Sequence, residues 1–140
     1  MSQFKQSVFV SLPVSDLSKS IVFYKSIGLT QKMEFPNNEG AWMELSDTFS
    51  VMLITHSKWK EFTPRAIPDA RKTAQFGLSI TTESKETVTN MIEKGTKAGG
   101  KADPNPVEEF DFMFGRSLED PDGHILEFKW MDMSAMPASN

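Results

Sequence analysis

The sequence predicts an α+β protein in which one βαβββ pattern occurs twice. Two segments, at 7–14 and 74–81, alternate apolar and polar residues in the way that half-buried strands do. Each segment precedes a stretch with helical periodicity that ends at glycine, a residue common just after a helix. Three short strand-like segments, separated by turn residues, follow each helix. The same order of elements in both halves indicates an internal repeat.

The first copy of the pattern occupies residues 7–55. Its expected elements are a strand at 7–14, a helix at 17–27, and strands at 30–35, 41–45 and 49–55. Ser15 or Asp16 is the expected N-cap of the helix, and Gly28 ends it. Successive side chains of a strand point to opposite faces, so we expect one face of the first strand to pack against the helix. That face carries Val8, Val10, Leu12 and Val14, and the opposite face carries Phe9 and Ser11.

The second copy occupies residues 74–131. Its expected elements are a strand at 74–81, a helix at 85–98, and strands at 101–102, 112–118 and 124–131. Ser84 can cap the helix, and Gly99 with Gly100 ends it. In the first strand of this copy the helix-facing side carries Phe76, Leu78 and Ile80, and the opposite side carries Gln75, Gly77 and Ser79. A turn of Asp120, Pro121, Asp122 and Gly123 precedes the last strand.

The two copies are joined by a connector at 56–73, which shows no strand pattern. Segments of this kind serve as a lid or a clasp, or they simply pack over a seam, and both interpretations stay open. The tail at 132–140 carries no pattern and is expected to be loose. The length of 140 residues is typical of one domain, so we expect a single domain over 1–140.

The composition narrows the class of protein. The 15 basic and 19 acidic residues give a formal net charge of −4, and no basic stripe indicates a nucleic-acid partner. Cysteine is absent, which excludes disulfides and thiolate metal sites. No apolar run approaches the roughly 20 residues that would cross a membrane, and no signal-peptide pattern is seen at the start. These features favour a cytoplasmic protein without nucleic-acid or membrane partners.

Two groups of residues resemble motifs of the vicinal oxygen chelate superfamily, which includes glyoxalases, bleomycin-resistance proteins and extradiol dioxygenases. The run from Val14 to Leu17, followed by Phe23-Tyr24 and Gly28-Leu29, is similar to the opening of a module in this family. The run from Asp120 to Glu127 is similar to the closing hairpin of a module. The resemblance implies that the two modules form one cupped mixed sheet with the helices on its outer face. It also implies a small-molecule ligand inside the cup and a homodimer.

The resemblance further implies a divalent metal held by about four side chains, from the first and last strands of each module. Counting back five positions from Val14 gives Phe9, and counting back five from Ile80 gives Gln75. The last-strand position matches Glu127 in the second module and Leu53 in the first. Phe9 and Leu53 cannot donate to a metal, so the site is incomplete. No cofactor is expected; if a divalent metal binds, its ligands are Gln75 and Glu127.

Further residues are candidates for contact with a small molecule in the cup. Alternation along the third strand of the first module places Trp42 and Glu44 on one face. Arg116 could meet an anionic group of the ligand or a carboxylate such as Glu127. The complete set of expected ligand-binding residues is Phe9, Ser11, Trp42, Glu44, Leu53, Gln75, Ser79, Arg116 and Glu127. Of the two histidines, His124 is expected to be structural or exposed. His56 is expected to be exposed, with a proton carrier as the alternative.

Three functions are compatible with these observations. The first is a protein that binds a small molecule without the complete metal site, as bleomycin-resistance proteins do in a dimer crevice. The excess of acidic over basic residues would favour a cationic ligand in that case. The second is a divalent-metal lyase, isomerase or dioxygenase with an unusual ligand set. The third is a non-catalytic dimeric domain of structural or regulatory function, and the sequence identifies no catalytic residue among these alternatives.

Overall fold

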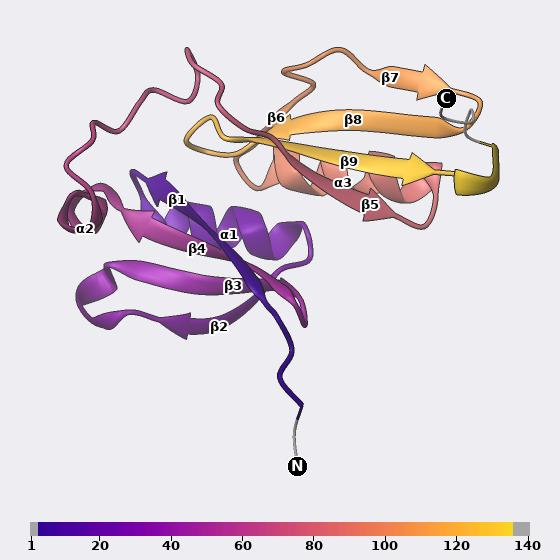
Figure 1. Cartoon of the computed structure of the whole chain (residues 1–140). Coiled ribbons are helices and arrows are strands. Elements are labelled where there is room, and N and C mark those ends of the chain that lie inside the picture. Colours follow the sequence, from indigo (N-terminus) through magenta and orange to yellow (C-terminus); the bar gives the residue numbers. More distant parts are fainter. Residues whose placement is uncertain (1–2, 136–140) are drawn as a thin grey trace. The chain divides into compact units, whose positions relative to one another are not determined.

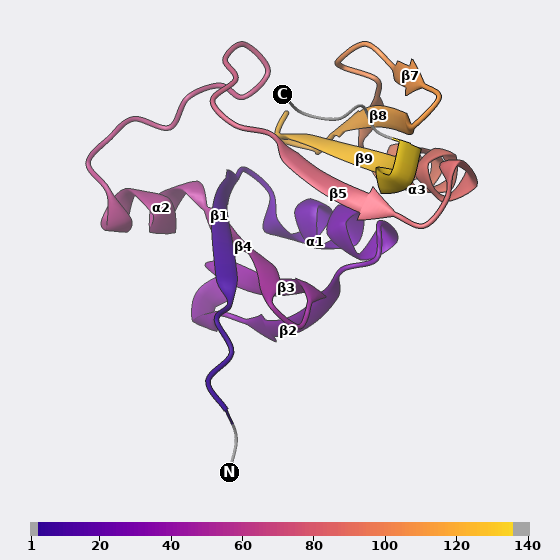
Figure 2. The ribbon, with the colours of Figure 1, turned by 45° about the vertical axis from the view of Figure 1, so that its right-hand side comes forward.

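The structure is a computed structural model that describes residues 3–135. It divides into two compact units, Met1–Pro68 and Asp69–Asn140. Each unit is a mixed sheet with one helix across one of its faces (Figures 1 and 2). This confirms the predicted α+β class and the repeated βαβββ order.

The first unit follows the predicted order closely. Its elements are β1 (Val8–Val14), α1 (Leu17–Ser26), β2 (Thr30–Glu34), the 3₁₀ helix η1 (Pro36–Asn38), β3 (Gly40–Ser46), β4 (Phe49–Thr55) and α2 (His56–Phe62). The strand order is β1-β4-β3-β2, with β1 parallel to β4 and the other pairs antiparallel. The connection from β1 through α1 therefore returns the chain to the far edge of the sheet, and β4 closes it beside β1.

Helix α1 is specified by local signals at both ends. The Asp16 side chain accepts a hydrogen bond from the backbone N–H of Lys19 at 3.1 Å, as an N-cap does. Gly28 follows the helix with a φ of 102°, a left-handed conformation that glycine adopts without steric cost. The helix buries Phe23 and Tyr24 on the side that faces the sheet.

The helix-facing side of β1 is buried over only part of its predicted length. Leu12 and Val14 are enclosed, whereas Val10 is half-buried and Val8 is 53% exposed. The prediction for Val8 is wrong because this residue is the first of the strand. The alternation itself holds, since Phe9 and Ser11 are exposed on the opposite side.

The second unit has the same layout with one added strand. Its elements are β5 (Leu78–Thr82), α3 (Lys85–Lys97), β6 (Lys101–Ala102), β7 (Glu108–Phe110), β8 (Met113–Glu119), β9 (Ile125–Met131) and the 3₁₀ helix η2 (Met133–Ala135). The strand order is β5-β9-β8-β6, and β7 also pairs with β8. Strand β5 is parallel to β9, as β1 is to β4, and α3 packs on β8 and β9.

Three expectations for the second unit need correction. Strand β5 begins at Leu78 rather than at residue 74, so Gln75 and Phe76 precede the sheet and Phe76 is 51% exposed. Strand β7 lies between two predicted strands, in a segment for which no element was predicted. The first part of the tail forms η2, and the remainder of it, residues 136–140, lies outside the described residues.

The turn before β9 has the geometry that its residues predict. The buried carboxylate of Asp120 accepts hydrogen bonds from the backbone N–H groups of Asp122 and His124, both at 2.9 Å. Gly123 has a φ of 99°, and a Cβ at this position would lie 2.9 Å from the backbone nitrogen of Arg71. Glycine is therefore required both by the backbone conformation and by the close approach of the segment at Arg71.

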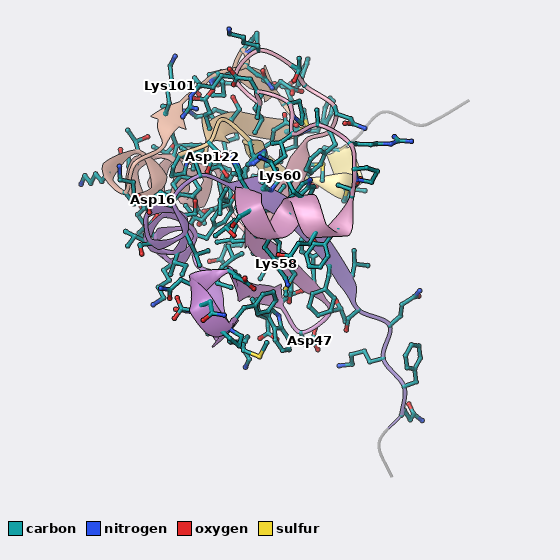
Figure 3. The ribbon with its side chains drawn as sticks, turned by 90° about the vertical axis from the view of Figure 1, so that its left-hand side faces the viewer. Asp16, Asp47, Lys58, Lys60, Lys101 and Asp122 are labelled. Atoms are coloured by element: carbon teal, nitrogen blue, oxygen red, sulfur yellow. The ribbon has the colours of Figure 1, made fainter. Side chains whose placement is uncertain are left out.

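The connector contains a helix that the sequence analysis did not predict. Helix α2 begins after Thr55, whose hydroxyl accepts a hydrogen bond from the backbone N–H of Lys58 at 3.4 Å. Lys58 projects from this helix (Figure 3). Its ammonium lies 3.5 Å from the carboxylate of Glu39 and 3.4 Å from that of Glu61. The helix is thereby tied to the residue that precedes β3.

Candidate functional site

The face of the first sheet opposite α1 carries an exposed aromatic pair. The rings of Phe9, on β1, and Trp42, on β3, lie with centroids 5.6 Å apart and an interplanar angle of 55°. Between them Met52 of β4 pairs in register with both Ser11 and Trp42, so its side chain lies on the same face. We call Phe9, Trp42 and Met52 the aromatic shelf. Phe9 is 49% exposed, and the other two residues are half-buried.

A buried hydroxyl holds the indole of the aromatic shelf in place. The Nε1–H of Trp42 donates a hydrogen bond to the Oγ of Ser50 at 2.8 Å. Ser50 is buried on β4, in register with Phe9 on one side and Glu44 on the other. Because its one donor is satisfied by Ser50 of the neighbouring strand, the indole leaves its ring surface rather than its N–H on this face of the sheet.

Glu44 lies beside the aromatic shelf on the same face. Its pairing with Ser50 places its half-buried side chain in one row with Phe9. Within residues 3–135, no lysine or arginine forms a salt bridge with Glu44. The aromatic shelf and the neighbouring Glu44 therefore combine aromatic surface with a negative charge, which is the combination that attracts an organic cation.

Leu53 does not lie on this face, and its predicted position was one residue out of register. It pairs with Leu12 and Ala41, and all three are enclosed on the side of the sheet that α1 covers. Its neighbour Met52 is the residue that faces away from α1, on the same side of β4 as Ser50. The sequence prediction failed here because residues 51–54 are all apolar, so alternation could not show which of them faces the helix.

The helix N-caps allow equivalent residues of the two units to be aligned. Asp16 caps α1 two residues after β1 ends, and Ser84 caps α3 two residues after β5 ends. The corresponding pairs are then Phe9 with Gly77, Ser11 with Ser79, Leu12 with Ile80, and Met52 with Glu127. This relation is supported by the sheet pairing, since Ser11 lies opposite Met52 and Ser79 lies opposite Glu127. Gln75 is not the counterpart of Phe9; it lies before β5 and is exposed.

On the second sheet, the face opposite α3 carries a group of polar residues. The hydroxyl of Ser79 donates a hydrogen bond to Oε1 of Glu127 at 3.3 Å. The ammonium of Lys129 lies 3.9 Å from Oε2 of the same carboxylate. We call Ser79, Glu127 and Lys129 the polar triad. Ser79 and Glu127 were both predicted for this face, whereas Lys129 was missed because a lysine on a strand gives no distinct signal.

Arg116 lies on the other side of the second sheet. It pairs with the buried Phe128, which shares the helix-covered face. Its guanidinium donates two hydrogen bonds to the carboxylate of Asp103, at 3.1 and 2.7 Å, and this bond raises the pKa of Arg116 above its usual value. The carboxylate that Arg116 meets is therefore Asp103 and not Glu127, and its contribution is to hold the segment before β7 against β8.

The two histidines take no part in either group of residues. His56 is the first residue of α2 and is half-buried, and His124 lies in the turn before β9, where its backbone N–H is bonded to Asp120. His124 lies at the turn, as expected, whereas His56 is half-buried rather than exposed.

The donor set can be compared with the metal site that the family resemblance implies. At the corresponding positions the first unit offers Phe9 and Met52, and the second offers Gly77 and Glu127. A phenyl ring and a glycine supply no donor, and a thioether suits soft metals rather than the divalent ions of such enzymes. In the part of the chain that the structure describes, no group of three or more histidine, aspartate or glutamate side chains could hold a metal ion. These residues do not fit a divalent metal centre.

No helix within the described residues is long and apolar enough to cross a membrane.

Comparisons with known proteins agree with the fold. The sequence model of the Glyoxalase/Bleomycin resistance protein/Dioxygenase superfamily matches residues 6–128. Among solved structures, the hypothetical protein SA1046 of S. aureus is 23% identical with a TM-score of 0.76, covering 91% of this chain and 95% of that one. A glyoxalase-related enzyme from Fulvimarina pelagi is 22% identical with a TM-score of 0.74, covering 91% and 88%.

A third solved structure is described as an antibiotic binding protein, TnmS3 from Streptomyces sp. CB03234. It is 19% identical with a TM-score of 0.63, and the match covers 94% of this chain and all of that one. No curated protein matches the sequence. The family model spans most of the chain and the structural matches share its fold, so the chain belongs to the Glyoxalase/Bleomycin resistance protein/Dioxygenase superfamily.

Proposed function

We propose that this protein binds a small, planar, positively charged organic molecule on the aromatic shelf and does so without a resident metal. The observation that carries the proposal is the pair of rings of Phe9 and Trp42, 5.6 Å apart, with the carboxylate of Glu44 on the same face of the sheet. Aromatic faces attract cations through their quadrupole, and a neighbouring carboxylate adds a direct charge interaction.

The spacing of these side chains supports a ligand of two or three fused rings. Phe9 and Glu44 are separated by one intervening strand, so their backbones lie roughly 10 Å apart. Trp42 and Glu44 are two residues apart on β3, or about 6.6 Å. A planar cation of this size could stack on the indole while its charge lies near the carboxylate.

The donor set also favours binding over metal-dependent chemistry. Phe9 and Met52 correspond to the first- and last-strand positions from which family enzymes bind their metal. At both positions the side chain offers apolar contact instead of a hard ligand. A protein that binds its ligand without a metal uses such apolar side chains as ligand contacts. A lyase or dioxygenase of this family would need metal-coordinating side chains at these positions.

The description of TnmS3 as an antibiotic binding protein is consistent with this function, because it shows that the fold can hold a small organic molecule. The acidic balance of the chain, with a formal net charge of −4, also favours a cationic ligand over an anionic one. The homodimer and the cytoplasmic location are predictions made from the sequence. Light scattering after gel filtration measures the oligomeric state directly.

Fluorescence titration with two probes of similar ring size tests the proposal. N-methylacridinium is a planar cation, and anthracene-9-carboxylate is a planar anion. We expect the parent protein to bind the cation at least about tenfold more tightly, the equivalent of ~1.4 kcal/mol. Trp42→Leu should abolish binding of the cation, and Glu44→Gln should remove most of the preference for it.

The matched controls are Trp59→Leu, on α2, and Glu34→Gln, an exposed carboxylate on β2 of the same sheet. Both should bind the two probes like the parent. Equal affinity of the parent for both probes would contradict the charge part of the proposal. Cation binding that survives Trp42→Leu would show that the aromatic shelf is not the site.

A further inference from the structure

We infer that the polar triad of the second unit is a subsite for the ammonium–carboxylate group of a zwitterion, as found in an α-amino acid. The inference depends on residues of the second unit alone. It goes beyond the proposed function, because the aromatic shelf belongs to the first unit and selects a different chemistry.

The first step concerns the position of Lys129. Its side chain lies along the sheet over Gly115, its partner on β8: a Cβ at Gly115 would be 3.3 Å from Cγ of Lys129 and 3.8 Å from both Cδ and Cε. A larger residue at position 115 would push this stem away. Glycine thus allows the lysine to lie flat, with its apolar stem covered and its ammonium directed to Glu127.

The second step concerns the carboxylate. One oxygen of Glu127 accepts the hydrogen bond from Ser79 at 3.3 Å, and the other lies 3.9 Å from the ammonium of Lys129. The side chains of Lys129 and Glu127 are only 21% and 23% exposed, so both charges are partly removed from water. Charges in such surroundings interact more strongly with a ligand than fully solvated charges do.

The third step is that both charged groups keep capacity for a ligand. At 3.9 Å the two charges attract, but the distance is too long for a hydrogen bond between them. A carboxylate can accept about four hydrogen bonds and an ammonium can donate three. Among the described residues, the hydrogen bond from Ser79 is the one side-chain hydrogen bond that Glu127 accepts, so most of this capacity is available.

The fourth step is access. Gly77 lies beside the triad, and apart from the adjoining residues Phe76 and Leu78 a Cβ at this position would meet within 4 Å only Oε1 of Glu127, at 3.7 Å, among the described residues. The approach to the carboxylate from this side is therefore open. The same position in the first unit holds Phe9, so the two units differ here in the space they leave.

Together these features complement a zwitterion. The ammonium of the ligand would pair with Glu127 and its carboxylate with Lys129, giving two charge-assisted interactions of opposite direction. A ligand with one charge could satisfy one of the two residues but would meet repulsion from the other. The triad should therefore prefer the zwitterion to either singly charged analogue.

Titration of ¹⁵N-labelled protein, followed by amide NMR spectra, tests this with three probes of matched shape. Leucine carries both charges, isoamylamine lacks the carboxylate, and 4-methylpentanoate lacks the ammonium. We expect leucine to bind most tightly and to shift the amide signals of β5 and β9. Lys129→Met should weaken leucine and 4-methylpentanoate about fivefold or more but not isoamylamine. Glu127→Gln should weaken leucine and isoamylamine but not 4-methylpentanoate.

Two further variants separate the subsite from general effects of charge or folding. Gly77→Val keeps all three polar residues but fills the approach, so it should abolish leucine binding. Lys101→Met removes an exposed lysine from β6 of the same sheet and should change nothing (Figure 3). The amide spectrum of each variant reports whether it is folded.

The inference is overturned if the three probes bind equally, if leucine does not bind, or if leucine binding is unchanged in Lys129→Met and Glu127→Gln. Trp42→Leu should leave leucine binding intact. Failure of the aromatic shelf and failure of the polar triad are therefore distinguishable in the same set of proteins.

Discussion

The Nε1–H of Trp42 donates its hydrogen bond to Ser50 Oγ, 2.8 Å away on the neighbouring strand. Because Ser50 is buried, Ser50→Ala would leave the indole N–H without this partner in a partly enclosed place. We expect a loss of about 1–3 kcal/mol in the free energy of unfolding, measured by urea denaturation. Ser11→Ala, which removes an exposed hydroxyl from the same face, is the control and should cost almost nothing. Equal stability of the two variants would show that the bond contributes little.

The alternation along β1 predicts a contrast between two of its apolar residues. Leu12 is enclosed against α1, so Leu12→Ala should cost roughly 2–5 kcal/mol because it leaves a cavity. Val8→Ala should have little effect, since Val8 is mostly exposed. Denaturation midpoints with equal slopes give both values. An unchanged midpoint for Leu12→Ala would mean that the assigned face is wrong.

The register of β4 can be tested by placing a carboxylate at two successive positions. Leu53 is 0% exposed on the helix-covered face, so Leu53→Glu would bury an unpaired charge and should prevent stable folding at neutral pH. Met52→Glu places the same side chain on the opposite, half-exposed face and should fold. Circular dichroism distinguishes the outcomes. A folded Leu53→Glu together with an unfolded Met52→Glu would reverse the assignment.

The ion pairs of Lys58 predict a small loss of stability at alkaline pH. A hydrogen bond with Glu61 and the charge of Glu39 raise the pKa of Lys58 in the folded protein. This contribution is complete below the pKa of the unfolded chain, about 10.4, and is lost as the pH rises through the higher folded value. The fall in Tm between pH 9 and pH 12 should be smaller in Lys58→Met than in the parent.

The control for this comparison is Lys60→Met, because Lys60 lies on the same helix and is exposed (Figure 3). Its Tm should follow that of the parent at each pH. The difference caused by Lys58 should also shrink in high salt, which screens exposed charges. A difference that persists unchanged in high salt would point to packing rather than to charge.

Added divalent metal should have little effect on the folded protein. A ligand specific for the native state stabilises it by about 2.7 kcal/mol at a hundred times its Kd. The positions that family enzymes use hold Phe9, Met52, Gly77 and Glu127, so Zn²⁺, Ni²⁺, Mn²⁺ or Fe²⁺ should leave the Tm nearly unchanged. Elemental analysis of untagged protein gives a second measurement. Uptake of one metal by the parent but not by Glu127→Gln would place the enzyme hypothesis first.

If no metal binds, a gain of function can test the corrected register. Phe9→His with Met52→Glu places two donors on the exposed face of the first sheet, on adjacent strands. The alignment based on sequence alone would pair Phe9→His with Leu53→Glu, which should not fold because Leu53 is enclosed. Metal binding by the first double variant would support the assignment of Met52. A folded first variant that binds no metal would show that the two side chains do not converge.

Local signals in the sequence predict the order of elements and most of their boundaries. Strand β4 and the two-residue β6 were predicted at their observed limits, and most other strands within one residue of theirs. The signals are local: an N-cap such as Asp16 or Ser84, a glycine with positive φ such as Gly28, and the turn of Asp120 and Gly123 each depend on a few adjacent residues. Helix α2 was missed because it is short and lies in a segment without a clear periodicity.

Which side chains meet depends on how the strands pair in three dimensions. Alternation could not orient β4, because residues 51–54 are all apolar, and the pairing of Leu53 with Leu12 settled its face. Arg116 found Asp103 instead of Glu127, and Lys129 reached Glu127 because Gly115 on the next strand leaves room for its stem. The contacts of Leu53 and Arg116 join residues that are far apart in the sequence, and the position of Lys129 depends on a glycine of the neighbouring strand. Period and propensity describe neighbours along the chain, whereas the partners of a charge or a ring depend on register across the sheet.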